Sequence, residues 1–190
     1  GIDYKKESID NNDKYFEAKI ATVLRDSEEN KISKTSTLNR TTSNLFGSIE
    51  NSFSEFFKLN YDFALDNNFN QFEHNSIEAE FKINNFITTF NFLEKNGEIG
   101  DVNTLENISE INFDEKNSLI FKTRRNRKIS LTEYYDLVYE YQNDCLTAGI
   151  KYRKTYYQDR DLKPKEDLFF TITLFPLTTL DQKIDQQLYR

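Results

Sequence analysis

Few side chains in this sequence have the chemistry and spacing of a catalytic or metal site. His74 is the single histidine and Cys145 the single cysteine among 190 residues. One cysteine can form neither an internal disulfide nor a zinc cluster, and no Ser/His/Asp arrangement can be argued around His74. The 32 acidic residues contain no pair that stands out as a general acid and base, and no P-loop occurs. We therefore expect no enzyme, no catalytic or metal-binding residues and no cofactor, with His74 in a solvent-facing loop.

Two charged clusters could bind ions. The first is a basic run that consists of Arg124, Arg125, Arg127 and Lys128. It either binds phosphate, such as an anionic head group, or forms a solvated charged loop, which is the more common outcome. The second, Asp159 to Asp161 (DRD), either binds a divalent cation or pairs with the basic run. We favour local ion pairing because a single DRD triplet has little metal specificity.

The composition excludes several classes of protein. A net charge of −7 argues against nucleic acid as the main partner. The 17 Phe and 11 Tyr are too many aromatic residues for a disordered chain, and five Gly with two Pro exclude a collagen-like one. No run approaches the roughly 18 apolar residues of a membrane-spanning helix. The strands of a membrane β-barrel need only about 9–11 residues, half of them apolar, so a barrel is compatible with the sequence.

The stretch from Tyr134 to Pro176 has the clearest period of two. Apolar residues alternate with polar ones in three segments, and Asn143-Asp144 separates the first two. This pattern predicts three consecutive strands. The apolar positions are Tyr135, Leu137, Tyr139 and Tyr141, then Leu146, Ala148, Ile150 and Tyr152, then Leu168, Phe170, Ile172 and Leu174. Leu131 to Gln142 also fits helical spacing, but its Tyr and Val content favours a strand.

Seven further segments alternate in the same way, which gives about ten strands. Asn84-Asn85 is the best two-residue hairpin turn among them, because Asn tolerates positive φ. Residues before Asp13 end in a polar turn, and the tail from Thr178 to Arg190 is expected to fray. The seven segments are Tyr15 to Arg25, Asn44 to Asn51, Phe57 to Asp66, Ile77 to Ile83, Phe86 to Phe92, Asn103 to Phe113 and Leu119 to Arg124.

The connections between these strands alternate in length. The short ones are Ser52–Glu55, Asn84–Asn85, Asp114–Asn117 and Asn143–Asp144. The long ones are Asp26–Thr42, Asp66–Glu73, Glu94–Asp101, Arg124–Thr132 and Gln158–Glu166. Short turns on one side and long loops on the other are typical of outer-membrane barrels. A soluble up-and-down sandwich is the alternative. The favoured fold is all-β: an antiparallel, up-and-down transmembrane β-barrel segment of about ten strands, part of a larger barrel.

Each predicted strand carries one apolar and one charged face. In a membrane barrel lipid covers the apolar face and the charged face lines a wet lumen. The final strand would then present Leu168, Phe170, Ile172 and Leu174 to lipid. If that strand runs toward the periplasm, the short turns are periplasmic, and Cys145 lies at the periplasmic rim, where disulfides form. From the residues alone, Cys145 is half of a disulfide, a reactive thiol or an ordinary small buried residue.

The last third of the chain resembles a known family. The residues that carry the resemblance are NSLIFKTRRN (Asn117 to Asn126), TRRNRK (Thr123 to Lys128), LTEYYDLVYEYQNDCLTAGIKY (Leu131 to Tyr152), YYQDRDLKP (Tyr156 to Pro164) and LFFTITLFPL (Leu168 to Leu177). They resemble the C-terminal barrel region of the LptD family (also called OstA or Imp), the lipopolysaccharide-assembly proteins of the Gram-negative outer membrane. The Lys, Asn and Ile bias is similar to that of alphaproteobacterial members. The resemblance is looser through Leu59 to Leu93.

The resemblance implies a function and a set of partners. LptD proteins are large barrels that receive lipopolysaccharide from a periplasmic Lpt bridge and insert it into the outer leaflet, with the plug lipoprotein LptE in the lumen. Ten strands are too few for that barrel, so residues 1–177 are expected to be its C-terminal portion and 178–190 a polar tail. The last strand is similar to strands that the barrel-assembly machinery recognises. The resemblance also implies a disulfide from Cys145 to the N-terminal region. The alternatives are a porin-type channel and a soluble β-sheet module that binds a glycan or a protein.

Overall fold

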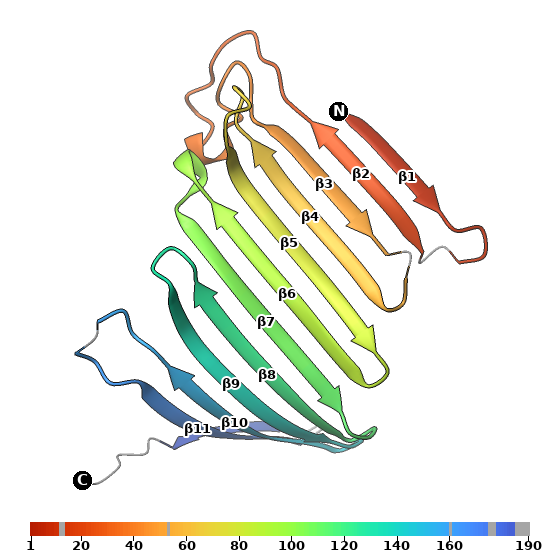
Figure 1. Ribbon diagram of the computed structural model, residues 1–190, viewed down its shortest axis with the longest axis vertical. Helices are drawn as coiled ribbons and strands as arrows, with labels where there is room; N and C mark the ends of the chain where they lie inside the picture. The colour runs from red at the N-terminus through yellow and green to blue at the C-terminus, as the bar shows by residue number, and fades with distance from the viewer. Residues whose placement is uncertain (12–13, 53, 160, 175–177, 185–190) are drawn as a thin grey trace. The chain divides into compact units, whose positions relative to one another are not determined.

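The computed structural model describes residues 1–190 except 12–13, 53, 160, 175–177 and 185–190. Its strands follow one another as an antiparallel meander in which each strand pairs with its neighbours in the sequence (Figure 1). Two short 3-10 helices, η1 (Lys34–Ser36) and η2 (Gly97–Ile99), lie in connections. The strands are β1 (Ile2–Glu7), β2 (Tyr15–Ala21), β3 (Leu45–Asn51), β4 (Phe57–Leu65), β5 (Phe72–Ile83), β6 (Phe86–Lys95), β7 (Val102–Asn112), β8 (Asn117–Asn126), β9 (Leu131–Gln142), β10 (Leu146–Thr155), β11 (Lys165–Leu174) and β12 (Thr178–Ile184).

The prediction of an all-β antiparallel meander is confirmed, including the three strands of the most regular stretch. Leu131 to Gln142 is strand β9, so the helical alternative is wrong. Asn84 and Asn85 form the two-residue hairpin turn, and Asn84 has a φ of 53°. Asn adopts this left-handed conformation at low cost, because its side chain can hydrogen-bond locally. In the described part of the chain β1 and β12 do not pair, so these strands do not close into a barrel.

Several predicted boundaries differ from the structure. The turn residues before Asp13 are preceded by a strand, β1. Of the tail that was expected to fray, Thr178–Ile184 forms β12, paired with β11, and residues 185–190 lie outside the described residues. The predicted long connection from Arg124 to Thr132 is wrong. Strands β8 and β9 continue into a tight turn of residues 127–130, where Ser130 has a φ of 53°. The basic residues had suggested a loop, but backbone pairing with β9 determines the strand.

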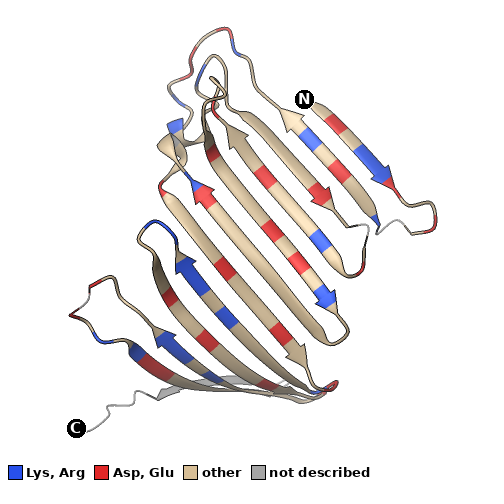
Figure 2. Cartoon of the chain, viewed as in Figure 1, with Lys and Arg blue, Asp and Glu red and all other residues tan. Residues whose placement is uncertain are grey.

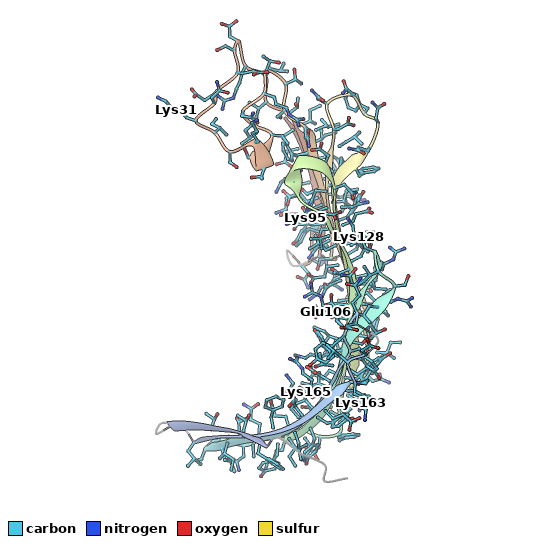
Figure 3. The ribbon with its side chains drawn as sticks, turned by 90° about the vertical axis from the view of Figure 1, so that its left-hand side faces the viewer. Lys31, Lys95, Glu106, Lys128, Lys163 and Lys165 are labelled. Atoms are coloured by element: carbon cyan, nitrogen blue, oxygen red, sulfur yellow. The ribbon has the colours of Figure 1, made fainter. Side chains whose placement is uncertain are left out.

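The chain divides into two compact units, and each is described by itself. Unit 1 comprises Gly1–Phe81 and Phe90–Leu105, and unit 2 comprises Lys82–Thr89 and Glu106–Arg190. Side chains project from both sides of the strand layer (Figure 3), and no second sheet covers a face in the described ranges. Ala64 is the one apolar residue that is buried in the described ranges. No helix in the described residues has the length and apolarity to cross a membrane.

The strand register sorts the residues of each unit onto two faces. Residues paired across antiparallel strands point to the same side, and successive residues point to opposite sides. In unit 2, Ile150 pairs with Tyr139 on β9 and with Phe170 on β11. In unit 1, Tyr61 pairs with Ile49 on β3 and with Ile77 on β5. Each unit therefore has an apolar face of aromatic and aliphatic residues, while the intervening positions form a polar face.

Unit 2 places its longer and shorter connections at opposite ends of the strands. One end carries Asn84–Asn85, the residues 113–116 and the residues 143–145. The other end carries the tight turn 127–130 and the longer connection 156–164. The short connections at the first end are as predicted. At the other end only 156–164 is long, and the predicted long loop from Arg124 to Thr132 is a turn as short as 113–116.

The turn between β7 and β8 supplies a test of this folding pattern. The carboxylate of Asp114 accepts hydrogen bonds from the backbone N–H of Lys116 at 2.8 Å, the backbone N–H of Asn117 at 2.9 Å and the Asn117 side chain at 2.8 Å. These bonds, that from Lys116 first, hold the pKa of Asp114 below its ordinary value. Because the folded-state pKa is lowered, the turn is stabilised above the ordinary Asp pKa. That stabilisation is lost as the pH falls through the lowered value.

We expect Asn117→Ala to move the Asp114 pKa part of the way back to its ordinary value, since one side-chain donor is lost and the backbone donors stay. The measurement is an NMR titration of the labelled Asp carboxyl carbon in the folded protein. An Asp114 that titrates at its ordinary value before and after the substitution would contradict the turn geometry.

Candidate functional site

The polar face of unit 2 carries a row of charges that alternate in sign across four neighbouring strands. Asp136 on β9 pairs with Lys122 on β8 and with Arg153 on β10, and Arg153 pairs with Asp167 on β11. Figure 2 shows acidic and basic residues distributed along the strands. Opposite charges at directly facing positions stabilise a sheet, while like charges would destabilise it. The register therefore places this row so that each charge faces an opposite one.

Asp136 is the centre of this row. It is only 1% exposed, although it lies on a single layer of strands. Arg153 donates two hydrogen bonds to the carboxylate, from Nε to Oδ1 and from a terminal guanidinium nitrogen to Oδ2, both of 2.6 Å. The Nζ of Lys151 lies 3.1 Å from Oδ2. The fork of the arginine matches the two carboxylate oxygens, which makes this a bidentate, charge-assisted contact.

Aromatic and acidic side chains extend the network. The Arg153 guanidinium lies over the Tyr134 ring, 4.8 Å from its centroid, and the Tyr134 hydroxyl donates to Oε1 of Glu106 at 2.7 Å. Lys165 lies 3.2 Å from Asp167. The charges around Asp136 are thus paired with one another. Such a face can bind polar groups.

Unit 1 contains a pocket of about 400 Å³ on its polar face. Two registered rows form its floor. The first runs Ala21, Phe46, Ala64 and His74 across β2 to β5, and the second runs Lys19, Ser48 and Asp62 across β2 to β4. Thr35 and Ser36 of η1 and Ile99 of η2 line the other side. The pocket therefore combines an aromatic ring, hydroxyls, an imidazole and charged groups within one unit.

The long connection between β2 and β3, residues 22–44, forms the cap of this pocket. Leu24 and Thr42 form an isolated antiparallel bridge that continues the β2–β3 hairpin. At its base, the buried Asn44 donates from Nδ2 to Oε2 of the buried Glu73 at 2.5 Å. The backbone N–H of Asn96 donates to the Glu73 carbonyl at 2.8 Å, which ties the connection that carries η2 to the same point. Buried polar groups that are hydrogen-bonded in this way fix the cap.

His74 was expected in a solvent-facing loop, and this prediction is wrong. It lies in β5, opposite Ala64, and lines the pocket. The predicted loop extended to Glu73, whereas β5 begins at Phe72. A register shift between Ala64 and Leu65 accommodates the early start of β5. The polar residues of this segment conceal the strand, because its period of two becomes apolar only from Ile77 onward.

The apolar face of unit 2 carries a cluster of polar side chains, Thr88, Asn107 and Ser109, that hydrogen-bond to one another. Thr88 shares its face with Phe86, and Ser109 shares its face with Ile111, by alternation along β6 and β7. Asn107 Nδ2 donates to Thr88 Oγ1 at 2.9 Å, Thr88 and Ser109 hydroxyls lie 2.8 Å apart, and Ser109 donates to Asn107 Oδ1 at 3.1 Å. The second Asn107 donor reaches the Thr89 carbonyl at 3.2 Å. The polar atoms of these three side chains therefore have hydrogen-bond partners within the protein and need none from water.

The predicted basic run lies at the end of β8 and in the turn that follows. Arg124 and Arg125 are the residues before Asn126, which ends β8, while Arg127 and Lys128 are in the turn 127–130. All four side chains are exposed. Nε of Arg124 lies 3.0 Å from Oε2 of Glu133, so this arginine is paired locally. The exposed position fits either the solvated turn or a contact with anionic groups.

The DRD segment and Cys145 also lie in connections. Asp159 Oδ1 accepts the backbone N–H of Asp161 at 3.0 Å, and Arg160 lies outside the described residues. No group of three His, Cys, Asp or Glu side chains in the described ranges could hold a metal ion. Cys145 is an exposed free thiol in the turn 143–145, and its N–H donates to Oδ1 of Asn143 at 3.0 Å. The disulfide therefore stays a prediction.

The four residues predicted to form the lipid face of the C-terminal strand share one face of β11. The prediction that this strand is the last one is wrong, because β12 follows it and pairs with it. Leu168, Phe170, Ile172 and Leu174 pair with Tyr152, Ile150, Ala148 and Leu146. The cross-strand neighbours are thus apolar along the whole of β10, which extends the apolar face over two strands.

Comparison with known proteins gives no relative: no protein-family model matches this chain, and no curated protein matches it.

The Asp136 network provides a prediction about stability. Asp136→Ala leaves Arg153 and Lys151 without their shared carboxylate. We expect a loss of about 2–3 kcal/mol, below the roughly 3–5 kcal/mol of a fully buried pair because Arg153 is partly exposed. Glu140→Ala, on the same strand and face, is the matched control and should cost less than about 0.5 kcal/mol. Urea unfolding of the folded protein measures both, and equal losses for the two variants would contradict a special role for Asp136.

Proposed function

We propose that this chain is the C-terminal part of an outer-membrane β-barrel that inserts lipopolysaccharide into the outer leaflet of the Gram-negative outer membrane. The observation that carries the proposal is the sorting of residues in each unit. One face consists of aromatic and aliphatic side chains that no described layer covers, and the other face is charged. Lipid would cover the first face and a wet lumen the second.

Strand lengths support a membrane-spanning role. Strands β4 to β11 contain between 9 and 12 residues each. A tilted strand needs about 9–11 residues to cross the hydrocarbon core of a bilayer. These strands are also longer than the usual 5–6 residues of strands in globular proteins.

The closed polar cluster on the apolar face supports the same role. A hydroxyl or amide in contact with lipid cannot bond to water, so it must find its partners within the protein. Thr88, Asn107 and Ser109 satisfy one another in a cycle of hydrogen bonds. On a water-exposed face such a closed arrangement would have no particular advantage.

The resemblance of Asn117 to Leu177 to the LptD family supports lipopolysaccharide as the substrate. In this account the polar face accommodates the sugar portion, and a lateral opening in the complete barrel lets the acyl chains reach the bilayer. The complete translocon would also contain further barrel strands, the periplasmic Lpt bridge and the plug lipoprotein LptE. Energy for transport would come from elsewhere, since the sequence contains no nucleotide-binding P-loop.

Cross-linking to the lipid tests this proposal against its alternatives. A photo-reactive amino acid is placed on the polar face, at Val138 or Thr171, and on the apolar face, at Leu137 or Ile172, in the full-length protein in its native envelope. We expect lipopolysaccharide adducts from the two polar-face positions, with the apolar positions as matched controls. Their absence from the polar face would favour a porin-type channel. A chain that is soluble without detergent would instead indicate a soluble binding module.

Cys145 provides a second test. In the full-length protein from its native envelope, we expect gel migration to differ between reducing and non-reducing conditions. Short turns of outer-membrane barrels lie on the periplasmic side, so the turn 143–145 would face this oxidising compartment. Cys145→Ser should abolish the difference. If migration is the same with and without reductant, Cys145 forms no disulfide, and the specific assignment to the lipopolysaccharide translocon loses support relative to a generic barrel.

A further inference from the structure

We propose that the pocket of unit 1 binds a neutral sugar ring. The pocket, of about 400 Å³, lies within the range of small-molecule sites, roughly 300–1,000 Å³. All residues that line the pocket belong to unit 1, so the pocket is formed without any other part of a barrel. The inference is also independent of the membrane location, because a soluble sheet with this pocket would bind the same chemistry.

Phe46 and His74 provide two ring-shaped walls. They lie in the same registered row, on β3 and β5, with Ala64 of β4 between them. Neighbouring strands are about 4.8 Å apart, so positions two strands apart are separated by about 10 Å. A gap of that width, with only a methyl group between the walls, accepts one flat ring. The C–H surface of a sugar packs against an aromatic side chain of this kind.

Asp62 provides the hydrogen-bonding group. It lies on β4 in the neighbouring row, beside Ser48, and its side chain is exposed to the pocket. In the described part of the chain no hydrogen bond or ion pair to the Asp62 carboxylate occurs. A free carboxylate can accept two hydroxyl groups at once, and adjacent hydroxyls on a sugar ring present that pair.

The charge of the pocket selects against ionic ligands. Lys19, the neighbour of Ser48 in the same row, is paired with Glu17, with Nζ 2.9 Å from Oε1. Its charge is therefore already balanced, while Asp62 would repel a phosphate or carboxylate. A wholly apolar ligand would remove Asp62 from water without giving it a partner, which is costly. A neutral ring with several hydroxyls satisfies both constraints.

The cap makes the pocket preformed. Thr35, Ser36 and Ile99 approach it from η1 and η2, and the buried Asn44–Glu73 hydrogen bond fixes the connection that carries η1. The η1 hydroxyls are themselves oriented: Ser36 donates to the Ser33 carbonyl at 2.7 Å. A site that is ordered before the ligand arrives loses less conformational entropy on binding.

Direct binding tests the proposal. The full-length protein in detergent micelles is titrated with two probes, maltotriose and a neutral, outer-core oligosaccharide cut from lipopolysaccharide, and binding is followed by saturation-transfer NMR. We expect saturable binding of at least one probe. Phe46→Ala and Asp62→Ala should each weaken it about tenfold, which corresponds to about 1.4 kcal/mol. Asn60→Ala, on the same strand and face but outside the pocket, is the matched control and should leave the affinity unchanged.

The possible results distinguish two sources of the sugar, and they also distinguish the sugar site from the proposed transport function. Binding of the core oligosaccharide points to the sugar portion of lipopolysaccharide, and binding of maltotriose alone points to a free oligosaccharide. Either result with the expected variant pattern supports the sugar site. No saturable binding, or binding that Phe46→Ala and Asp62→Ala leave unchanged in a protein with unaltered circular dichroism, overturns it. Sugar binding without lipopolysaccharide adducts at Val138 and Thr171 would retain the pocket and reject the transport function.

Discussion

The antiparallel register of the strands determines every side-chain contact described above. Pairing fixes which residues share a face, and a slip by one residue would exchange the two faces completely. In unit 2 such a slip between β9 and β10 would separate Arg153 from Asp136 and move Ile150 away from Tyr139. The bidentate contact between Arg153 and Asp136 is therefore a register marker on the polar face, while aromatic and aliphatic pairs mark the same register on the apolar face.

A fold of this kind has no interior of its own. Ala64 is the one apolar residue buried in the described ranges, so the stability that a soluble domain gains from its core must come from what the faces contact. The polar face and the apolar face are stabilised by different contacts. On the polar face charges pair in rows, and a cap covers part of unit 1. On the apolar face of unit 2, Thr88, Asn107 and Ser109 bond to one another.

The sequence predicts the strands whose local pattern is strong. Strands β9 to β11 alternate over their whole length, and the Asn84-Asn85 turn is a local signal, so both were found. Strand β1 was missed because its apolar residues, Ile2 and Tyr4, are followed by three charged ones at a sheet edge. The start of β5 and the position of His74 were missed because polar residues occupy both faces there.

The candidate sites were harder to predict because they join residues that are distant in the sequence. Asp136 and Arg153 become partners only when the turn 143–145 fixes the register, and their charges at facing positions are then a recognisable signal. The pocket of unit 1 requires six segments, β2 to β5, η1 and η2, and the cap that carries η1 has no sequence period. No local pattern around Phe46 or Asp62 indicates that they line one cavity.

Spin labels along β10 can show whether lipid covers one face of the strands and water the other. Single nitroxide labels replace successive residues from Leu146 to Thr155 in the full-length protein in bilayers, and collisions with oxygen and with a water-soluble nickel complex are measured. The account predicts a period of two. Labels at Ile150 and Tyr152 should collide mainly with oxygen dissolved in lipid, and labels at Lys151 and Arg153 mainly with the nickel complex. Equal access of the nickel complex to all positions would contradict it.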